Sequence, residues 1–142
     1  MRLYILLRID QLKPAAESLK IKTGLVISPS LKPILDGQPP FSGFPAILSN
    51  GNCTDCNHIS NCFNYDCVLL EKLMRFMNRF MSTEYRTDIG RITIELNVIR
   101  EQMGCDAVHV TMPEYTCQNK EMDYMIAKDT VQFIGSLSQR YS

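Results

Sequence analysis

Prolines dominate one stretch of the chain and limit the secondary structure that can form there. Five of the seven prolines fall between Pro29 and Pro45, with two glycines among them. Because proline lacks a backbone N–H and has a fixed φ, such a run excludes a regular helix or a central strand. We therefore predict a long irregular connection over 29–45, which divides the chain into two parts of different character.

The residues before this connection favour strands. Residues 3–9 are apolar at nearly every position, as in a strand that is covered on both faces. Pro14 suits the first turn of a short helix, and residues 23–28 have the composition of a second short strand. The order strand, helix, strand predicts the start of a βαβ unit.

The residues after the connection favour helices. Polar side chains recur at helical spacing within 68–82, which predicts an amphipathic helix with Asp66 as its cap. Residues 88–103 fit a helix that ends at Gly104, although 91–98 also alternate as a strand of a hairpin would.

Two further elements follow. Residues 105–112 have the pattern of a strand, either after the second helix or as the partner of 91–98 in a hairpin. A third amphipathic helix is predicted from Lys120 to about Arg140, with Asn119 as its cap.

Together these elements predict a single α/β or α+β domain over 1–142 with a small mixed sheet. Residues 1–50 are then strand-rich, 51–67 hold a cysteine cluster, and 68–142 are mainly helical with about three amphipathic helices. A chain of 142 residues that is 45% hydrophobic is large enough to bury one core.

Four cysteines lie directly after the connection in the spacing C-x2-C-x5-C-x4-C. They are Cys53, Cys56, Cys62 and Cys67. A two-residue gap lets two thiolates face one ion, and four thiolates satisfy tetrahedral zinc. We predict a structural Zn²⁺ site that fastens the proline-rich loop to the first long helix. The alternative ligands are His58, Cys105 and Cys117.

The cluster is similar in outline to a zinc knuckle, whose pattern is C-x2-C-x4-H-x4-C. Its first three cysteines also resemble the triad of FNR-type and WhiB-type iron–sulfur regulators. That second resemblance implies a [4Fe–4S] cluster as the alternative cofactor, completed by a fourth cysteine. The pair Cys53 and Cys56 further resembles the C-x-x-C motif of thioredoxin-like proteins.

Two observations predict a cytoplasmic location. Arg8 and Asp10 interrupt the N-terminal apolar run, so it is shorter than the roughly 7–15 apolar residues of a secretory signal. No stretch of the sequence approaches the roughly 18 apolar residues of a membrane span. Cytosolic thiols stay reduced, which favours metal ligation. In an oxidising compartment the six cysteines would instead form three disulfides.

The remaining features narrow the function class. The sequence lacks a glycine-rich phosphate loop, a nucleophile elbow and an H-E-x-x-H helix. Zero net charge and an absence of lysine and arginine within the cluster argue against nucleic-acid binding. We predict a non-enzymatic regulatory or protein-interaction protein with a structural zinc. The alternative is an iron–sulfur redox sensor or electron-transfer protein.

The expected partner is another protein, and no membrane contact is expected. The predicted helix over 68–81 leaves only a narrow polar stripe, so its broad apolar face also predicts a homodimer.

Overall fold

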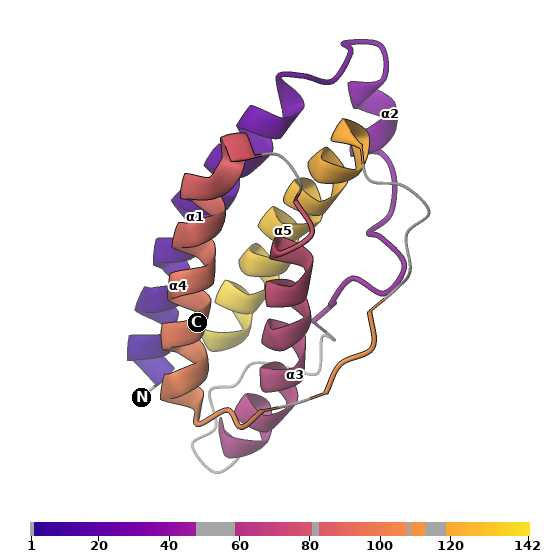
Figure 1. Ribbon diagram of the computed structural model, residues 1–142. Coiled ribbons are helices and arrows are strands. Elements are labelled where there is room, and N and C mark those ends of the chain that lie inside the picture. The colour runs from indigo at the N-terminus through magenta and orange to yellow at the C-terminus, as the bar shows by residue number, and fades with distance from the viewer. Residues whose placement is uncertain (1, 48–58, 81–82, 108, 113–118) are drawn as a thin grey trace.

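The computed structural model describes residues 2–47, 59–80, 83–107, 109–112 and 119–142 (Figure 1). The helices are α1 (Arg2–Gly24), α2 (Lys32–Asp36), α3 (Ile59–Met77), the 3₁₀ turn η1 (Thr83–Tyr85), α4 (Arg86–Met103) and α5 (Lys120–Tyr141). No strand occurs within the described ranges, so the predicted α/β or α+β fold with a small mixed sheet is wrong.

A single long helix, α1, replaces the predicted strand at the N-terminus. Its inward positions follow a helical stripe of fully buried side chains, among them Ile5, Ile9 and Leu12. Its outward positions also carry aliphatic residues such as Leu3 and Leu7, which are exposed. Because aliphatic residues occur on both sides, the helical period is hidden, and the segment has the composition of a doubly covered strand.

The same helix continues through the predicted short helix and into the predicted second strand. Pro14 lies inside α1 on its exposed side, and not in a first turn. After Gly24 the chain turns, and the backbone N–H of Leu25 donates to the carbonyl of Ile21 at 3.1 Å. A Cβ on Gly24 would lie 3.1 Å from the ring of Tyr124, so the close approach of α1 to α5 favours glycine here.

The proline-rich connection contains α2, a short helix that the sequence did not predict. Pro33 occupies the first turn of α2, where a missing backbone N–H costs nothing. Further along, the N–H of Phe41 donates to Asp129 of α5 at 2.9 Å. The ring of Phe44 lies 4.8 Å from that of Phe76 on α3. The connection therefore bridges α5 and α3.

The three helices predicted in the C-terminal half are confirmed, with different limits. α3 begins at Ile59, so Asp66 lies inside the helix and is not its cap. α4 agrees with the helical interpretation of 88–103, and Gly104 ends it in the left-handed conformation with φ of 74°. Asn119 caps α5, because its side chain accepts a hydrogen bond of 2.9 Å from a backbone N–H in the first turn.

The predicted strand over 105–112 is absent from the described part of that segment, which comprises 105–107 and 109–112. The N–H of Cys105 donates to the carbonyl of Arg100 at 2.9 Å and so completes the end of α4. The alternative hairpin of 91–98 with 105–112 is ruled out as well, because 91–98 lie within α4.

Contacts between helices fix their relative directions. Lys22 near the end of α1 pairs with Asp88 near the start of α4 at 2.9 Å, so these two helices are antiparallel. Ser138 near the end of α5 donates to Asp10 in the first half of α1 at 2.9 Å, so α1 and α5 are antiparallel as well. α1 and α3 point one way, and α4 and α5 point the other way (Figure 1).

This helix order requires connections of different kinds. The connections from α1 to α3 and from α4 to α5 each link helices that point in the same direction. Their described parts, 25–47 and 104–107 with 109–112, run back along the bundle (Figure 1). Segment 78–85 links the antiparallel helices α3 and α4 and is short. The described helices thus form an up-up-down-down bundle with two long crossovers.

The core lies between the four long helices. Each of α1, α3, α4 and α5 contributes fully buried side chains, for example Ile9, Leu73, Leu96 and Leu137. The apolar face of α3 that predicted a dimer surface belongs to this core, since Leu70, Leu73, Phe76 and Met77 are buried within the chain.

Two neighbouring positions on α4 distinguish the helix from the alternating strand. Leu96 is 0% exposed and Ile94 is 64% exposed, whereas in a strand both would share one face. We expect Leu96→Ala to lower the free energy of unfolding by about 2–5 kcal/mol, and Ile94→Ala by less than about 0.5 kcal/mol. Denaturant unfolding of both variants measures this, and large, equal losses would contradict the helix.

Candidate functional site

The cysteines expected to bind metal are only partly described by the structure. Outside the described residues lie Cys53, Cys56, His58 and Cys117. Cys62 and Cys67 lie on α3, and Cys105 follows the end of α4. Cys67 and Cys105 form a disulfide with their Cα atoms 5.5 Å apart, and Cys62 is disulfide-bonded as well.

Disulfide formation removes the negative charge that a metal-binding sulfur needs. Zinc and iron–sulfur clusters bind thiolates, and neither sulfur of a disulfide is one. In the part of the chain that the structure describes, no group of three or more His, Cys, Asp or Glu side chains is placed to hold a metal ion. The predicted zinc and iron–sulfur sites stay predictions, and they compete with disulfides at Cys62 and Cys67.

Sequence reasoning placed Cys105 among the alternative ligands and missed its pairing with Cys67. The two residues are 38 positions apart, so no local spacing reveals the bond. A signal was present in the helical pattern, because Cys67 belongs to the buried face of α3. Cys105 comes directly after the glycine that ends α4, where an antiparallel neighbour would be within reach.

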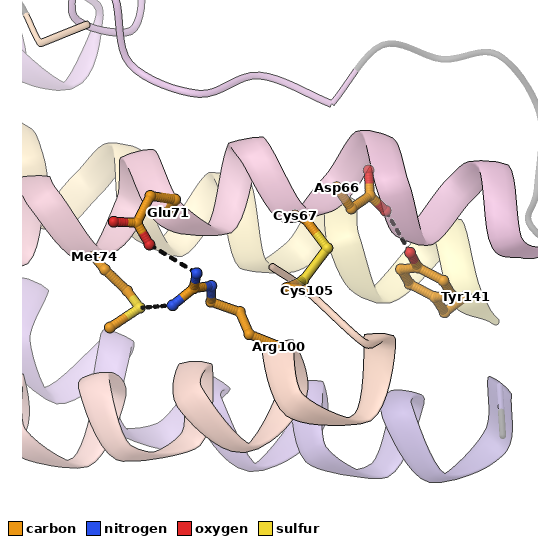
Figure 2. Close-up of a disulfide and its surroundings, with 7 residues drawn as sticks. All are labelled: Asp66, Cys67, Glu71, Met74, Arg100, Cys105 and Tyr141. Carbon is orange, nitrogen blue, oxygen red and sulfur yellow. Dashed lines mark hydrogen bonds and ion pairs between the residues drawn. A yellow bond between two sulfur atoms is a disulfide. The ribbon is translucent and has the colours of Figure 1, made fainter. Parts of the chain in front are cut away.

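A partly buried ion pair lies beside the disulfide and joins the same two helices (Figure 2). Arg100 of α4 reaches α3, where its Nη2 lies 2.9 Å from Oε2 of Glu71 and its Nη1 donates to Sδ of Met74 at 3.5 Å. Arg75 also donates to Glu71, at 3.0 Å. The carboxylate of Glu71 therefore binds two guanidinium groups. α3 is held to α4 both by the disulfide and by these charged hydrogen bonds.

On the other side of the disulfide, the buried carboxylate of Asp66 joins α3 to the end of α5 (Figure 2). It accepts hydrogen bonds from the hydroxyl of Tyr141 and from Nε of Arg140, the latter at 3.0 Å. Burial raises the pKa of Asp66, while these two donors oppose the rise. Burial and the nearby Asp66 raise the pKa of Tyr141. Because this carboxylate is enclosed, it fastens the two helices and is inaccessible to a ligand.

Two more buried carboxylates lie on α5. Asp129 accepts a hydrogen bond from the backbone N–H of Phe41 in the proline-rich connection, and its Oδ1 lies 3.5 Å from Nζ of Lys128. Burial raises the pKa of Asp129, although both of these partners oppose the rise. Asp123 is 9% exposed, and burial raises its pKa to about 6. Both groups are positioned by packing within the bundle.

A small cavity lies between the proline-rich connection and α5. It has a volume of about 130 Å³, and its lining includes Phe44, Pro45, Asp129, Gln132 and Phe133. Binding sites for organic ligands usually enclose roughly 300–1,000 Å³. A wider hollow of about 730 Å³ lies between α1, the proline-rich connection and α5, and its lining includes Lys20, Asp36, Gln38 and Lys128. This hollow is open to solvent, so it does not enclose a ligand. The outer surface is therefore the better candidate for a functional contact.

Among the exposed apolar residues that the structure describes, several lie in a line along the outside of α1 and into the turn that follows it. This outer α1 stripe consists of Leu3, Leu7, Pro14, Ile21 and Leu25. Its four aliphatic side chains are between 56% and 78% exposed. Single exposed leucines are ordinary, but a row of them over about 33 Å of helix indicates a contact surface.

The inner side of α1 is fully engaged, which sets the outer stripe apart. Its buried residues face α4 and α5, and Arg8 and Lys22 pair with Glu95 and Asp88 of α4 at 3.5 and 2.9 Å. These contacts orient the helix firmly. The outer α1 stripe is our candidate interaction surface.

Comparison with known proteins supplies no relative. The chain matches no protein-family model, no curated protein and no solved structure. Within the described ranges, each helix is too short or too polar to span a bilayer. Function must therefore be inferred from topology, from cysteine chemistry and from the surface.

Removal of either cysteine of the bridge tests its contribution to stability. A disulfide between residues 38 positions apart lowers the entropy of the unfolded chain by an amount worth about 4 kcal/mol. We expect Cys67→Ser and Cys105→Ser each to lower the free energy of unfolding by about 3–4 kcal/mol. The double variant should lose no more than either single variant, because both remove the same bond. Additive losses would contradict the pairing.

Replacement of Asp123 tests the effect of its burial. Because its pKa is about 6 in the folded chain and 3.8 ordinarily, stability falls as the pH rises through 6. We expect Asp123→Asn to raise the free energy of unfolding by about 1–3 kcal/mol at pH 7. The gain should shrink below pH 6 and vanish near pH 4, where the carboxyl is neutral in both states.

Thermal or denaturant unfolding between pH 4 and pH 8 provides the measurement. Glu121→Gln is the matched control, because Glu121 lies in the same first turn of α5 and is only half-buried. A gain in the Asp123 variant that is the same at every pH would contradict the assignment.

Proposed function

We propose that this protein is a disulfide-stabilised helical ligand that acts by binding a protein receptor outside the reducing cytosol. The helix order carries the proposal: α1 and α3 point one way, α4 and α5 point the other, and two long crossovers make this possible (Figure 1). Growth-hormone and cytokine bundles share this up-up-down-down arrangement. Since topology supports a function only by analogy, the chemistry and the surface of the chain must agree with it.

The cysteine chemistry supports this proposal. Cys67 and Cys105 form a disulfide with each other, and Cys62 is also disulfide-bonded. Disulfides persist in secreted proteins and are rare in the cytosol, where thiols are kept reduced. The proposal therefore replaces the expected cytoplasmic location with an oxidising compartment.

The surface supports it as well. A ligand of this kind works through contact, and the outer α1 stripe presents aliphatic side chains on a rigid helix. The regulatory or protein-interaction role expected from the sequence is retained here. A structural zinc is not needed for this role, because the disulfide and the ion pair of Glu71 with Arg100 already hold α3 to α4.

Binding to intact cells of the source organism tests the proposal. We expect the oxidised, labelled protein to bind saturably with a dissociation constant below about 100 nM, or about −9.5 kcal/mol, and to be displaced by unlabelled protein. The matched control is the same chain after reduction and alkylation, which should not compete. Binding that fails to saturate, or that the alkylated chain displaces equally well, would contradict the proposal.

The state of the thiols tests the compartment separately. Cells are lysed in an alkylating reagent, and mass spectrometry then shows whether Cys67 and Cys105 are joined in the native protein. We expect the intact bridge. Alkylated Cys67 and Cys105 would refute the proposed compartment. About one zinc per chain, measured by elemental analysis of protein purified without alkylation, would favour the structural-zinc interpretation.

A further inference from the structure

We infer that two copies of this chain associate through the outer α1 stripe, with their α1 helices antiparallel and a two-fold axis beside Pro14. The inference is independent of the proposed receptor, because it needs only a second copy. The sequence predicted a homodimer through the apolar face of α3, but that face is buried within the chain. The dimer surface inferred here is on α1 instead.

The spacing of the stripe is the first observation. Leu3, Leu7, Pro14, Ile21 and Leu25 follow one another at intervals of four, seven, seven and four residues, so the pattern is the same from either end. At about 100° per residue, all five fall within an arc of about 40° on the helix. The N–H of Leu25 donates to the carbonyl of Ile21 at 3.1 Å, so the helical path reaches the last member.

A pattern that reads equally in both directions matches itself in an antiparallel pair. Rotation about an axis beside Pro14 sets Leu3 against Leu25 of the second copy, and Leu7 against Ile21 of the second copy. Aliphatic side chains then meet at each of these positions, which a self-complementary two-fold interface requires.

The charges beside the stripe are the second observation, and they favour the antiparallel direction. One edge carries two residues of each sign, namely Asp10, Lys13, Glu17 and Lys20. Within one chain Lys13 lies 3.1 Å from Asp10, and both side chains remain about half exposed, so a second copy can still reach them. In the antiparallel pair this edge meets the same edge of the second copy. Lys13 then lies within about 3 Å of helix rise from Glu17 of the second copy, and Asp10 lies equally near its Lys20.

A parallel pair lacks this match. It would bring the charged edge against the opposite edge of the second copy, which carries Arg8 and Lys22. Both cations are already paired with carboxylates of α4, at 3.5 and 2.9 Å. The same ion pairs hold α1 in place, so little conformational freedom is lost when the stripe is covered.

Light scattering after size-exclusion chromatography measures the association. At 100 µM we expect a mass of twice the 16.2 kDa chain. The variant Leu7→Asp with Ile21→Asp should have the monomer mass at this concentration, with unchanged helix content by circular dichroism. Ile94→Asp is the matched control, because Ile94 is similarly exposed on α4, and it should remain dimeric. A monomeric wild type, or a dimer that the Leu7 and Ile21 changes leave intact, would overturn the inference.

Cysteine cross-linking measures the direction of the helices. We expect Leu7→Cys combined with Ile21→Cys to give a covalent dimer on mild oxidation, seen on a non-reducing gel. Leu7→Cys alone should not cross-link, because the two copies of position 7 lie about 21 Å apart in the antiparallel pair. Wild-type protein, oxidised in the same way, controls for the native cysteines. Efficient cross-linking by Leu7→Cys alone would indicate a parallel pair and would overturn the proposed geometry.

Discussion

The antiparallel packing of α1 against both α4 and α5 is the contact on which the rest of the structure depends. Its inner stripe is fully buried, and ion pairs such as Lys22 with Asp88 fix its register on α4. Once α1 occupies this position, the parallel helix α3 can be reached only by a connection that returns along the bundle. That connection packs on α5 through Phe41 and Asp129, which leaves α5 buried on most of its circumference.

The other end of the bundle is held by a denser set of interactions. The disulfide of Cys67 lies between the ion pair of Glu71 with Arg100 and the hydrogen bonds of Asp66 with Tyr141 (Figure 2). Burial of Asp66 is costly for a charged group, and two donors offset that cost. α3 is thereby joined to α4 by a covalent bond and to α5 by a buried carboxylate.

The sequence predicts those elements whose polar residues keep to one face. α3, α4 and α5 were found because their polar side chains, the glycine after Met103 and the cap at Asn119 give local signals. α1 was missed because Leu3 and Leu7 on its outer side fill the gaps in the helical period. Local patterns also could not pair Cys67 with Cys105, because that bond depends on the directions of two helices. The outer α1 stripe was missed as well, because a segment interpreted as a strand gives no sign of which residues lie along one side of a helix.

The residues that mislead secondary-structure prediction are the same residues that form the inferred interface. Aliphatic residues on two opposite sides of a helix are typical of a segment covered on both sides, whereas an exposed side usually carries polar or charged residues. The run over 3–9 was interpreted as a strand covered on both faces. The structure shows a helix with one covered face, lined by Ile5 and Ile9. An antiparallel second copy would cover the other face, and it would account for an aliphatic pattern that packing within one chain leaves unexplained.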